Sequence, residues 1–199
     1  MKKSIFISLI IGLVLSLQSC ELFNLELQRD YDFTPAPVHQ YLDVDAYEFI
    51  AGRKNIDFLY LNLMIEQAGL QDLYKQTGYT FLLPNDDMAT KWLSDNGHAT
   101  VSDCSNEEIT DYLKSMICEG EYVTLGLGTS DVEVKTLKEG TFLYLRVHEV
   151  QSVSEAKEDW FSLVVNGTEK IVRTSNLRPT NGIIHVLQAD FDRNYVPGL

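Results

Sequence analysis

The sequence predicts an α+β domain, because helical patterns fill the first part of the chain and strand patterns fill the rest. Apolar residues recur with a period of about 3.6 up to Cys118, and from Tyr122 onward they recur with a period of about 2. Helices followed by strands are typical of α+β folds with a mainly antiparallel sheet. Residues 183–187 near the end are apolar and β-branched on both faces, which is typical of a strand covered on both sides.

Residues 1–19 are predicted to be a signal peptide. The apolar core at residues 5–15 is too short for a membrane span, which needs about 20 apolar residues. Residues 17–20, Leu-Gln-Ser-Cys, resemble a bacterial lipobox, so we expect Cys20 to carry lipid and to become the first mature residue. The alternative is a plain secretory signal in which Cys20 is incidental.

The predicted boundaries follow from composition. Residues 20–40 are polar and contain two prolines, which favours a tether rather than a packed element. The folded domain is expected over residues 41–193, followed by a short tail at residues 194–199.

The charge of the chain limits its partners. A formal net charge of −13 argues against nucleic acid and against electrostatic docking onto anionic lipid. We therefore expect contact with a membrane through the N-terminal lipid only. The partner expected from this reading is an envelope or extracellular protein or polysaccharide.

Four helices are predicted, at residues 44–51, 56–68, 86–96 and 105–118. Asn55, Asn85 and Ser105 are suited to cap the last three of them. The second of these helices is apolar around most of its circumference, which predicts that it is buried.

Two cysteines beyond the lipobox flank the last predicted helix. A continuous helix there would hold Cys104 and Cys118 about 20 Å apart. A disulfide needs Cα atoms within about 7 Å, so we predict no bond between them.

Seven segments are predicted to be strands. One lies in the first half of the chain, and the others lie where apolar residues recur with a period of about 2. They are residues 79–83, 122–125, 132–136, 141–150, 160–165, 170–174 and 182–191. Asn166-Gly167 and Asn181-Gly182 are turn signals, because both residue types tolerate positive φ.

A search for catalytic and metal-binding motifs is mostly negative, so no enzyme, cofactor or metal site is predicted. The sequence contains no zinc-protease, serine-hydrolase or phosphate-loop motif. The pair Asp86 and Asp87 is explained by helix capping. His185 lies inside the most apolar strand and is expected to be a hydrogen-bonded core residue; an envelope hydrolase that uses His185 with an acidic partner is a minor alternative.

Three blocks of sequence resemble fasciclin-like domains in the order typical of that family. Residues 58–73 end in Ala-Gly-Leu-Gln-Asp-Leu, residues 79–87 read Tyr-Thr-Phe-Leu-Leu-Pro-Asn-Asp-Asp, and residues 165–186 hold the closing motif with its two Asn-Gly pairs and Ile-His-Val. The matching positions, with a structural role, are Tyr79, Thr80, Pro84, Asn85, Asn166, Gly167, Asn181, Gly182 and His185. The resemblance implies a wedge of two mainly antiparallel β-sheets with a helical cluster along one side.

The chain departs from the family pattern at two places. Ser115 and Met116 stand where the family often has a Tyr-His pair, and Asn176, Leu177 and Arg178 replace the adhesion segment of animal members. Integrin-type adhesion is therefore not implied.

The resemblance implies a non-catalytic adhesion or binding module at a cell surface. The signal and lipobox resemble those of Bacteroidota envelope lipoproteins, which favours the bacterial outer membrane, facing either the periplasm or the outside. The alternative is a glycan-binding accessory lipoprotein of a polysaccharide-uptake system. Its candidate aromatic platform is Phe142, Tyr144 and Trp160, although these rings also suit the core of a covered sheet.

Overall fold

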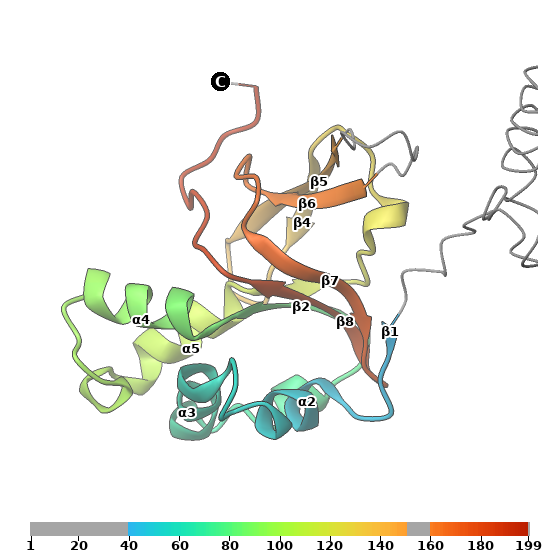
Figure 1. Cartoon of the computed structure of the whole chain (residues 1–199). Helices are drawn as coiled ribbons and strands as arrows, with labels where there is room; N and C mark the ends of the chain where they lie inside the picture. Colours follow the sequence, from blue (N-terminus) through green and yellow to red (C-terminus); the bar gives the residue numbers. More distant parts are fainter. Residues whose placement is uncertain (1–39, 151–159, 199) are drawn as a thin grey trace, which may run out of the picture. The chain divides into compact units, whose positions relative to one another are not determined.

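A computed structural model describes residues 40–150 and 160–198 (Figure 1). The predicted signal peptide, nearly all of the predicted tether, the predicted lipidation site Cys20 and the whole of residues 151–159 lie outside the described residues. Among the residues that are described, no helix has both the length and the apolar character needed to span a bilayer.

The described elements are as follows. The α-helices are α2 (Ala46–Gly52), α3 (Leu59–Ala68), α4 (Asp86–Asp95) and α5 (Asn106–Lys114), and short 3-10 turns lie at Leu73–Lys75 (η1), Val101–Asp103 (η2) and Thr124–Gly126 (η3). The strands are β1 (Gln40–Tyr41), β2 (Tyr79–Pro84), β3 (Ile117–Glu119), β4 (Val132–Lys135), β5 (Phe142–Val150), β6 (Trp160–Val165), β7 (Val172–Arg178) and β8 (Gly182–Leu187).

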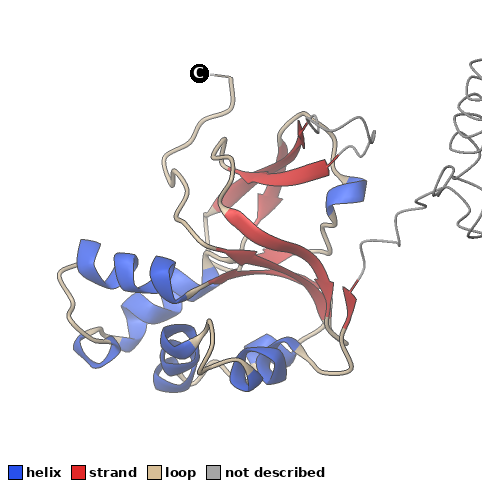
Figure 2. Ribbon diagram, viewed as in Figure 1, coloured by secondary structure: helices blue, strands red, loops and turns tan. Residues whose placement is uncertain are grey.

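The strands form two sheets. The larger sheet has the order β1-β7-β8-β2-β3, and the smaller sheet has the order β4-β5-β6. Figure 2 shows the α-helices gathered along one side of the larger sheet, with the smaller sheet and the turn η3 on its other side. This arrangement confirms the predicted α+β class with two sheets and a helical cluster. Four of the six pairs of described strands are antiparallel, but β2–β8, at the centre of the larger sheet, and β1–β7, at its edge, run parallel.

Strand β8 is covered on both faces, as its composition predicted. All six of its residues are buried. Gly182, at its start, is required by close approach: an added Cβ would lie 2.2 Å from the Tyr79 carbonyl oxygen. Neither Asn181 nor Gly182 has a positive φ, so the predicted reason for the turn at Asn181-Gly182 is wrong. At the other predicted turn, Asn166 and Gly167 do adopt φ of 47° and 68°.

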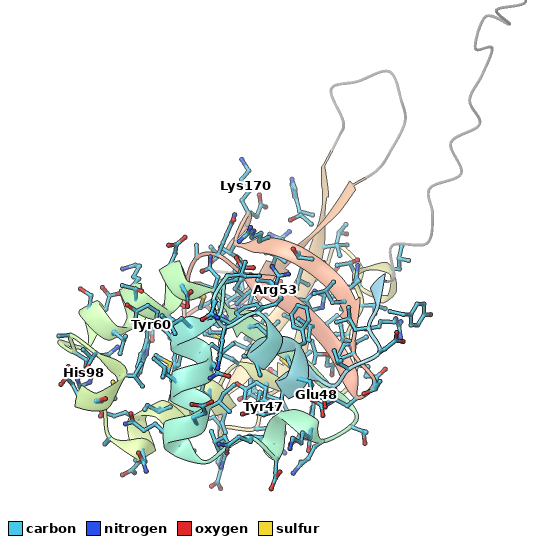
Figure 3. All side chains as sticks on the ribbon, turned by 60° about the horizontal axis from the view of Figure 1, so that its bottom comes forward. Tyr47, Glu48, Arg53, Tyr60, His98 and Lys170 are labelled. Atoms are coloured by element: carbon cyan, nitrogen blue, oxygen red, sulfur yellow. The ribbon has the colours of Figure 1, made fainter. Side chains whose placement is uncertain are left out.

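Helix α3 differs from its prediction in two ways. It begins at Leu59, and Asn55 does not cap it; instead the backbone N–H of Tyr60 donates to Asp86 Oδ1 at 3.0 Å. A cap supplied from a distant segment leaves no local sequence signal. The helix is also not buried all round, because Leu59 and Leu63 are 43% and 41% exposed while its other apolar face is in the core. Figure 3 labels Tyr60 on this helical side of the molecule.

Helix α5 ends earlier than predicted, at Lys114, and the chain continues into β3. Strand β3 pairs with β2 and places Cys118 opposite Thr80. Both Cys104 and Cys118 are buried free thiols, so the absence of a bond between them is confirmed, although the predicted reason, a continuous helix, is wrong.

The other strand predictions hold with shifts, except for one. Residues 122–125 are not a strand; they lead into the turn η3, where the Thr124 N–H donates to Asn176 Oδ1 at 2.9 Å. Strand β7 lies later than predicted and β8 ends earlier, at Leu187. The turn at Asn166-Gly167 does not close a hairpin: it carries the chain from β6, in the smaller sheet, to β7, in the larger sheet.

Candidate binding cleft

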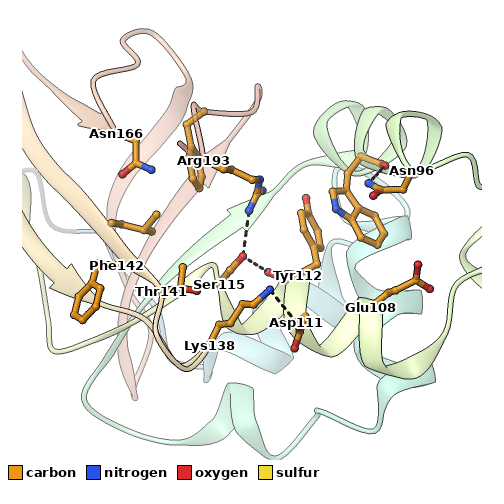
Figure 4. Close-up of a pocket in the computed structure, with 13 residues that line it drawn as sticks. Asn96, Glu108, Asp111, Tyr112, Ser115, Lys138, Thr141, Phe142, Asn166 and Arg193 are labelled. Atoms are coloured by element: carbon orange, nitrogen blue, oxygen red, sulfur yellow. Dashed lines mark hydrogen bonds and ion pairs between the residues drawn. The ribbon is translucent and has the colours of Figure 1, made fainter. Parts of the chain in front are cut away.

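A cleft of about 430 Å³ lies where the helical cluster meets the smaller sheet (Figure 4). Helix α4 contributes Trp92, and α5 contributes Tyr112. The β4–β5 turn contributes Lys138, and the segment after β8 contributes Arg193. The volume falls within the range of about 300–1,000 Å³ that is typical of small-molecule sites.

Local sequence fixes the helices that form one wall. Asn85 Oδ1 accepts the N–H of Met88 at 3.0 Å and so begins α4. Ser105 and Glu108 form a reciprocal capping box at the start of α5. These caps confirm the predicted roles of Asn85 and Ser105, and they set the direction in which each helix presents its side chains.

Aromatic rings stack along this wall. The rings of Trp92 and Tyr112 are stacked with centroids 4.3 Å apart. The guanidinium of Arg193 lies 5.4 Å from the Tyr112 centroid and 5.0 Å from that of Phe191. Such cation–π contacts hold the arginine in one place at the edge of the cleft.

Polar groups complete the lining. Arg193 Nη1 donates to Ser115 Oγ at 3.2 Å, and Ser115 Oγ donates to the Tyr112 carbonyl at 2.7 Å (Figure 4). Lys138 forms an ion pair with Asp111 at 2.9 Å. Ser115, which by the resemblance stands at the first position of the Tyr-His pair, is among the residues that line the cleft.

The hydroxyl of Tyr112 differs from these polar groups, which are hydrogen-bonded or ion-paired. Tyr112 is only 4% exposed, and its Oη has no hydrogen-bond partner among the described residues. Burial raises the pKa of this phenol above its usual value, so the hydroxyl stays protonated at neutral pH. It can donate one hydrogen bond and accept others.

The predicted motif residues mostly lie away from the cleft and bond to backbone. Asn181 accepts the Ala46 N–H at 2.9 Å and donates to the carbonyls of Tyr74 and Gln76 at 2.8 and 2.9 Å. Thr80 donates to the Gly120 carbonyl at 2.8 Å and accepts the Tyr122 N–H at the same distance. Tyr79, Pro84 and Gly182 lie in the β2–β8 pair.

Asn166 links the motif to the cleft. Its Oδ1 accepts the Tyr144 N–H, and its Nδ2 donates to the Asp192 carbonyl, both at 2.8 Å. Gly167 follows it, and an added Cβ there would lie 2.4 Å from the Tyr195 ring. Asn166 therefore anchors the segment that carries Arg193, and it is the only residue among the predicted motif positions that lines the cleft.

His185 is fully buried, as expected of a core residue. Its Nε2–H donates to the Tyr122 carbonyl at 2.9 Å, and its Nδ1 has no partner among the described residues. Burial lowers its pKa to about 4. It does not line the cleft, and within residues 40–150 and 160–198 no three His, Cys, Asp or Glu side chains are grouped to hold a metal ion.

The three aromatic candidates do not come together. Phe142, 45% exposed, lines the cleft. Tyr144 is half-buried, outside the lining, and its hydroxyl donates to Glu133 at 2.9 Å. The side chain of Trp160 lies outside the described part of the chain; its backbone pairs with Val150, six residues along β5 from Tyr144 and thus about 20 Å away.

Sequence reasoning did not identify the cleft. The helical period places Trp92 and Tyr112 on the inner faces of their helices, which suits a core as well as a cleft, and no sequence pattern singles out Arg193. The available signal was weak: two aromatic residues on the inner faces of two neighbouring capped helices. The contribution of Arg193 depends on where the chain returns after β8, which no local pattern encodes.

Comparison with known proteins identifies the family. The sequence profile of the fasciclin domain matches residues 57–189. The chain belongs to the fasciclin domain family. Fasciclin domains are known as adhesion and binding modules, and membership supports a non-catalytic binding role for this chain.

Two further comparisons are more limited. No curated protein matches the sequence. Among solved structures, the fasciclin domain here is similar to a FAS1 domain pair from the insect cell adhesion molecule fasciclin I, with 21% sequence identity and a TM-score of 0.49. That match covers 75% of this chain and 47% of the insect chain, so this chain spans about half of the domain pair.

Proposed function

We propose that the chain is a lipid-anchored, non-catalytic adhesion or binding module of the bacterial envelope. Its fasciclin domain supports the binding role, and the lipobox at residues 17–20 supports attachment to the outer membrane through Cys20. In this proposal the domain faces the periplasm or the outside and binds an envelope or extracellular protein or polysaccharide.

The cleft beside α5 is the observation that carries the binding role. It combines stacked rings and paired charges with a buried hydroxyl that has no partner among the residues described, and such a mixed lining is suited to recognition. His185 does not line it, which argues against the hydrolase alternative. The ring of His185 is fully buried, so this imidazole has no access to a substrate in the folded domain.

The anchoring part is tested by replacing Cys20. Cells that produce the full chain are grown with an alkyne-bearing fatty acid, and the label on the protein is compared between wild type and Cys20→Ser. We expect label and partition into the detergent phase for the wild type only. Label on Cys20→Ser, or an unlabelled wild type, would contradict lipid attachment at this residue.

The binding part is tested by presenting the detergent-purified lipoprotein to a glycan array and to fractionated envelope proteins side by side. We expect saturable binding on at least one of the two. Turnover of a substrate without saturable binding would contradict the module.

A glycan-binding accessory subunit of a polysaccharide-uptake system is the second candidate. The exposed ring of Phe142 in the cleft favours it, because sugars stack their C–H faces on aromatic rings. Co-purification of the lipoprotein with an outer-membrane transporter is expected for this candidate but not for a stand-alone adhesion module.

A further inference from the structure

The sequence contains three Asn-Gly pairs, at residues 96–97, 166–167 and 181–182. Asn-Gly is the dipeptide most prone to spontaneous deamidation, because glycine has no side chain to keep its backbone nitrogen away from the asparagine amide carbon. The fold decides which of the three pairs can reach the geometry that this attack requires.

The reaction needs only the two residues and water. The backbone nitrogen of the glycine bonds to Cγ of the asparagine, the bond from Cγ to Nδ2 breaks, and Nδ2 leaves as ammonia with the proton of the attacking nitrogen. Water then opens the five-membered imide at either carbonyl, which gives aspartate or isoaspartate. A neutral amide is thereby replaced by a carboxylate.

Two of the pairs hold their asparagine in the core. Asn166 and Asn181 are 3% and 4% exposed. Nδ2 of Asn166 donates to the Asp192 carbonyl, and Nδ2 of Asn181 donates to the carbonyls of Tyr74 and Gln76. Each Oδ1 also accepts a backbone N–H, so both side chains are fixed. Attack at these residues therefore requires the surrounding core to open, which approaches global unfolding.

The pair at residues 96–97 lies instead at the exposed end of α4. Asn96 follows the helix directly, and its Nδ2 donates to the Trp92 carbonyl at 2.8 Å (Figure 4). The Gly97 N–H donates to the Ser94 carbonyl at 3.0 Å. These two bonds must open before the Gly97 nitrogen can attack. Both belong to the last turn of a helix, which opens at a far smaller cost in free energy than a central strand does.

We propose that Asn96 is a site of spontaneous deamidation in the folded protein and that its conversion adds a negative charge to the cleft. Asn96 lines the cleft with two carboxylates, Glu108 and Asp111, and two cations, Lys138 and Arg193. A third carboxylate would leave this lining with an excess of negative charge. The inference concerns the chemistry at the end of α4 and does not depend on the proposed binding role.

The test follows the detergent-purified full chain during incubation in heavy-oxygen water at mildly alkaline pH. Peptide mapping by mass spectrometry measures conversion at each asparagine, and the incorporated heavy oxygen excludes conversion that occurs during later digestion. We expect aspartate and isoaspartate at residue 96, formed at least about tenfold faster than at Asn166 or Asn181, which must first lose two or three buried hydrogen bonds. In urea the three pairs should convert at similar rates, because the fold no longer distinguishes them.

Two controls separate exposure from the effect of the glycine. Asn55 is also exposed but is followed by Ile56, whose branched side chain hinders the nitrogen, so Asn55 should convert more slowly than Asn96 in the same sample. Asn96→Gln keeps an amide at this position but would have to form a six-membered ring. This variant should show no conversion at residue 96, and the rates at Asn166 and Asn181 should be unchanged.

Three results would overturn the inference. Conversion of residue 96 in urea but not in the folded protein would show that the last turn of α4 protects it. Conversion of Asn166 or Asn181 as fast as Asn96 without urea would show that burial does not govern the reaction. Equal rates at Asn55 and Asn96 would show that Gly97 is not its cause.

Discussion

The β2–β8 pair and the cleft beside α5 differ in how their polar side chains are satisfied. Around β2 and β8, Thr80 and Asn181 each bond backbone groups from distant segments. In the cleft, Tyr112 Oη is unpartnered among the described residues, and Lys138 and Arg193 are paired at partly exposed positions. The family's motif residues therefore serve mainly the fold, whereas groups capable of recognition lie mostly outside the motifs.

The largest effect is expected at Gly182, where the backbone of β8 lies against the Tyr79 carbonyl of β2 with no room for a Cβ. A side chain in Gly182→Val would place Cβ 2.2 Å from the Tyr79 carbonyl oxygen, which neither backbone can avoid within the sheet. We expect a loss of more than about 4 kcal/mol in the free energy of unfolding, measured by urea denaturation, or failure to fold.

Gly52 provides the control for that substitution. It lies at the end of α2 without a positive φ, and an added Cβ meets nothing within 4 Å. Gly52→Ala should be neutral or stabilise the fold by about 0.5 kcal/mol. Equal losses in the two variants would refute close approach as the role of Gly182.

The next effect is expected at Asn181, whose side chain joins α2 and η1 to the start of β8. Asn181→Ala leaves the Ala46 N–H and the carbonyls of Tyr74 and Gln76 without this partner, and we expect a loss of about 3 kcal/mol. Asn55→Ala is the control: Asn55 is exposed and caps no helix, so its urea midpoint should be unchanged. A shift at Asn55 as large as that at Asn181 would contradict both assignments.

These residues also show how far the sequence could lead. The burial of β8 and the caps at Asn85 and Ser105 were predictable, because each depends on a few neighbouring residues. The cap of α3 was not, because Asp86 supplies it from another segment. The parallel pairing of β2 with β8 is likewise set by tertiary packing and has no local signature.

The cleft was less predictable than the fold for the same reason. Phe142 was identified as a candidate from its place in a strand, and it does line the cleft. Trp92, Tyr112 and Arg193 come from three separate segments, and only the folded chain brings them together. Amphipathic patterns identified the inner faces of α4 and α5 but could not distinguish core from cleft.

A pH-dependent effect is expected at His185, the one buried imidazole of the β2–β8 region. Its folded pKa of about 4 lies below the ordinary value of 6.5, so the unfolded chain binds the proton first as the pH falls. The stability that neutral His185 contributes is present above pH 6.5 and is lost between pH 6.5 and 4, by up to about 3 kcal/mol.

His185→Gln tests this, because glutamine can still donate to the Tyr122 carbonyl and does not titrate. Urea denaturation should show a shallower loss of stability for this variant between pH 6.5 and 4 than for the wild type. His148→Gln, at a side chain that is 47% exposed, is the control for replacing a histidine at the surface. Parallel curves for wild type and His185→Gln would show that another group governs the acid response.

The smallest effect on stability is expected in the cleft, at Arg193. Its side chain is 36% exposed, and its ion pair with Asp190 is therefore screened by solvent. Arg193→Met keeps much of the apolar contact with Tyr112 and Phe191 and removes the charge, so we expect a loss below about 1 kcal/mol by urea denaturation. A loss as large as that of Asn181→Ala would mean that the cleft wall is as necessary to the fold as the β2–β8 pair. A small loss would leave this wall free to serve binding, since the core would not depend on its charge.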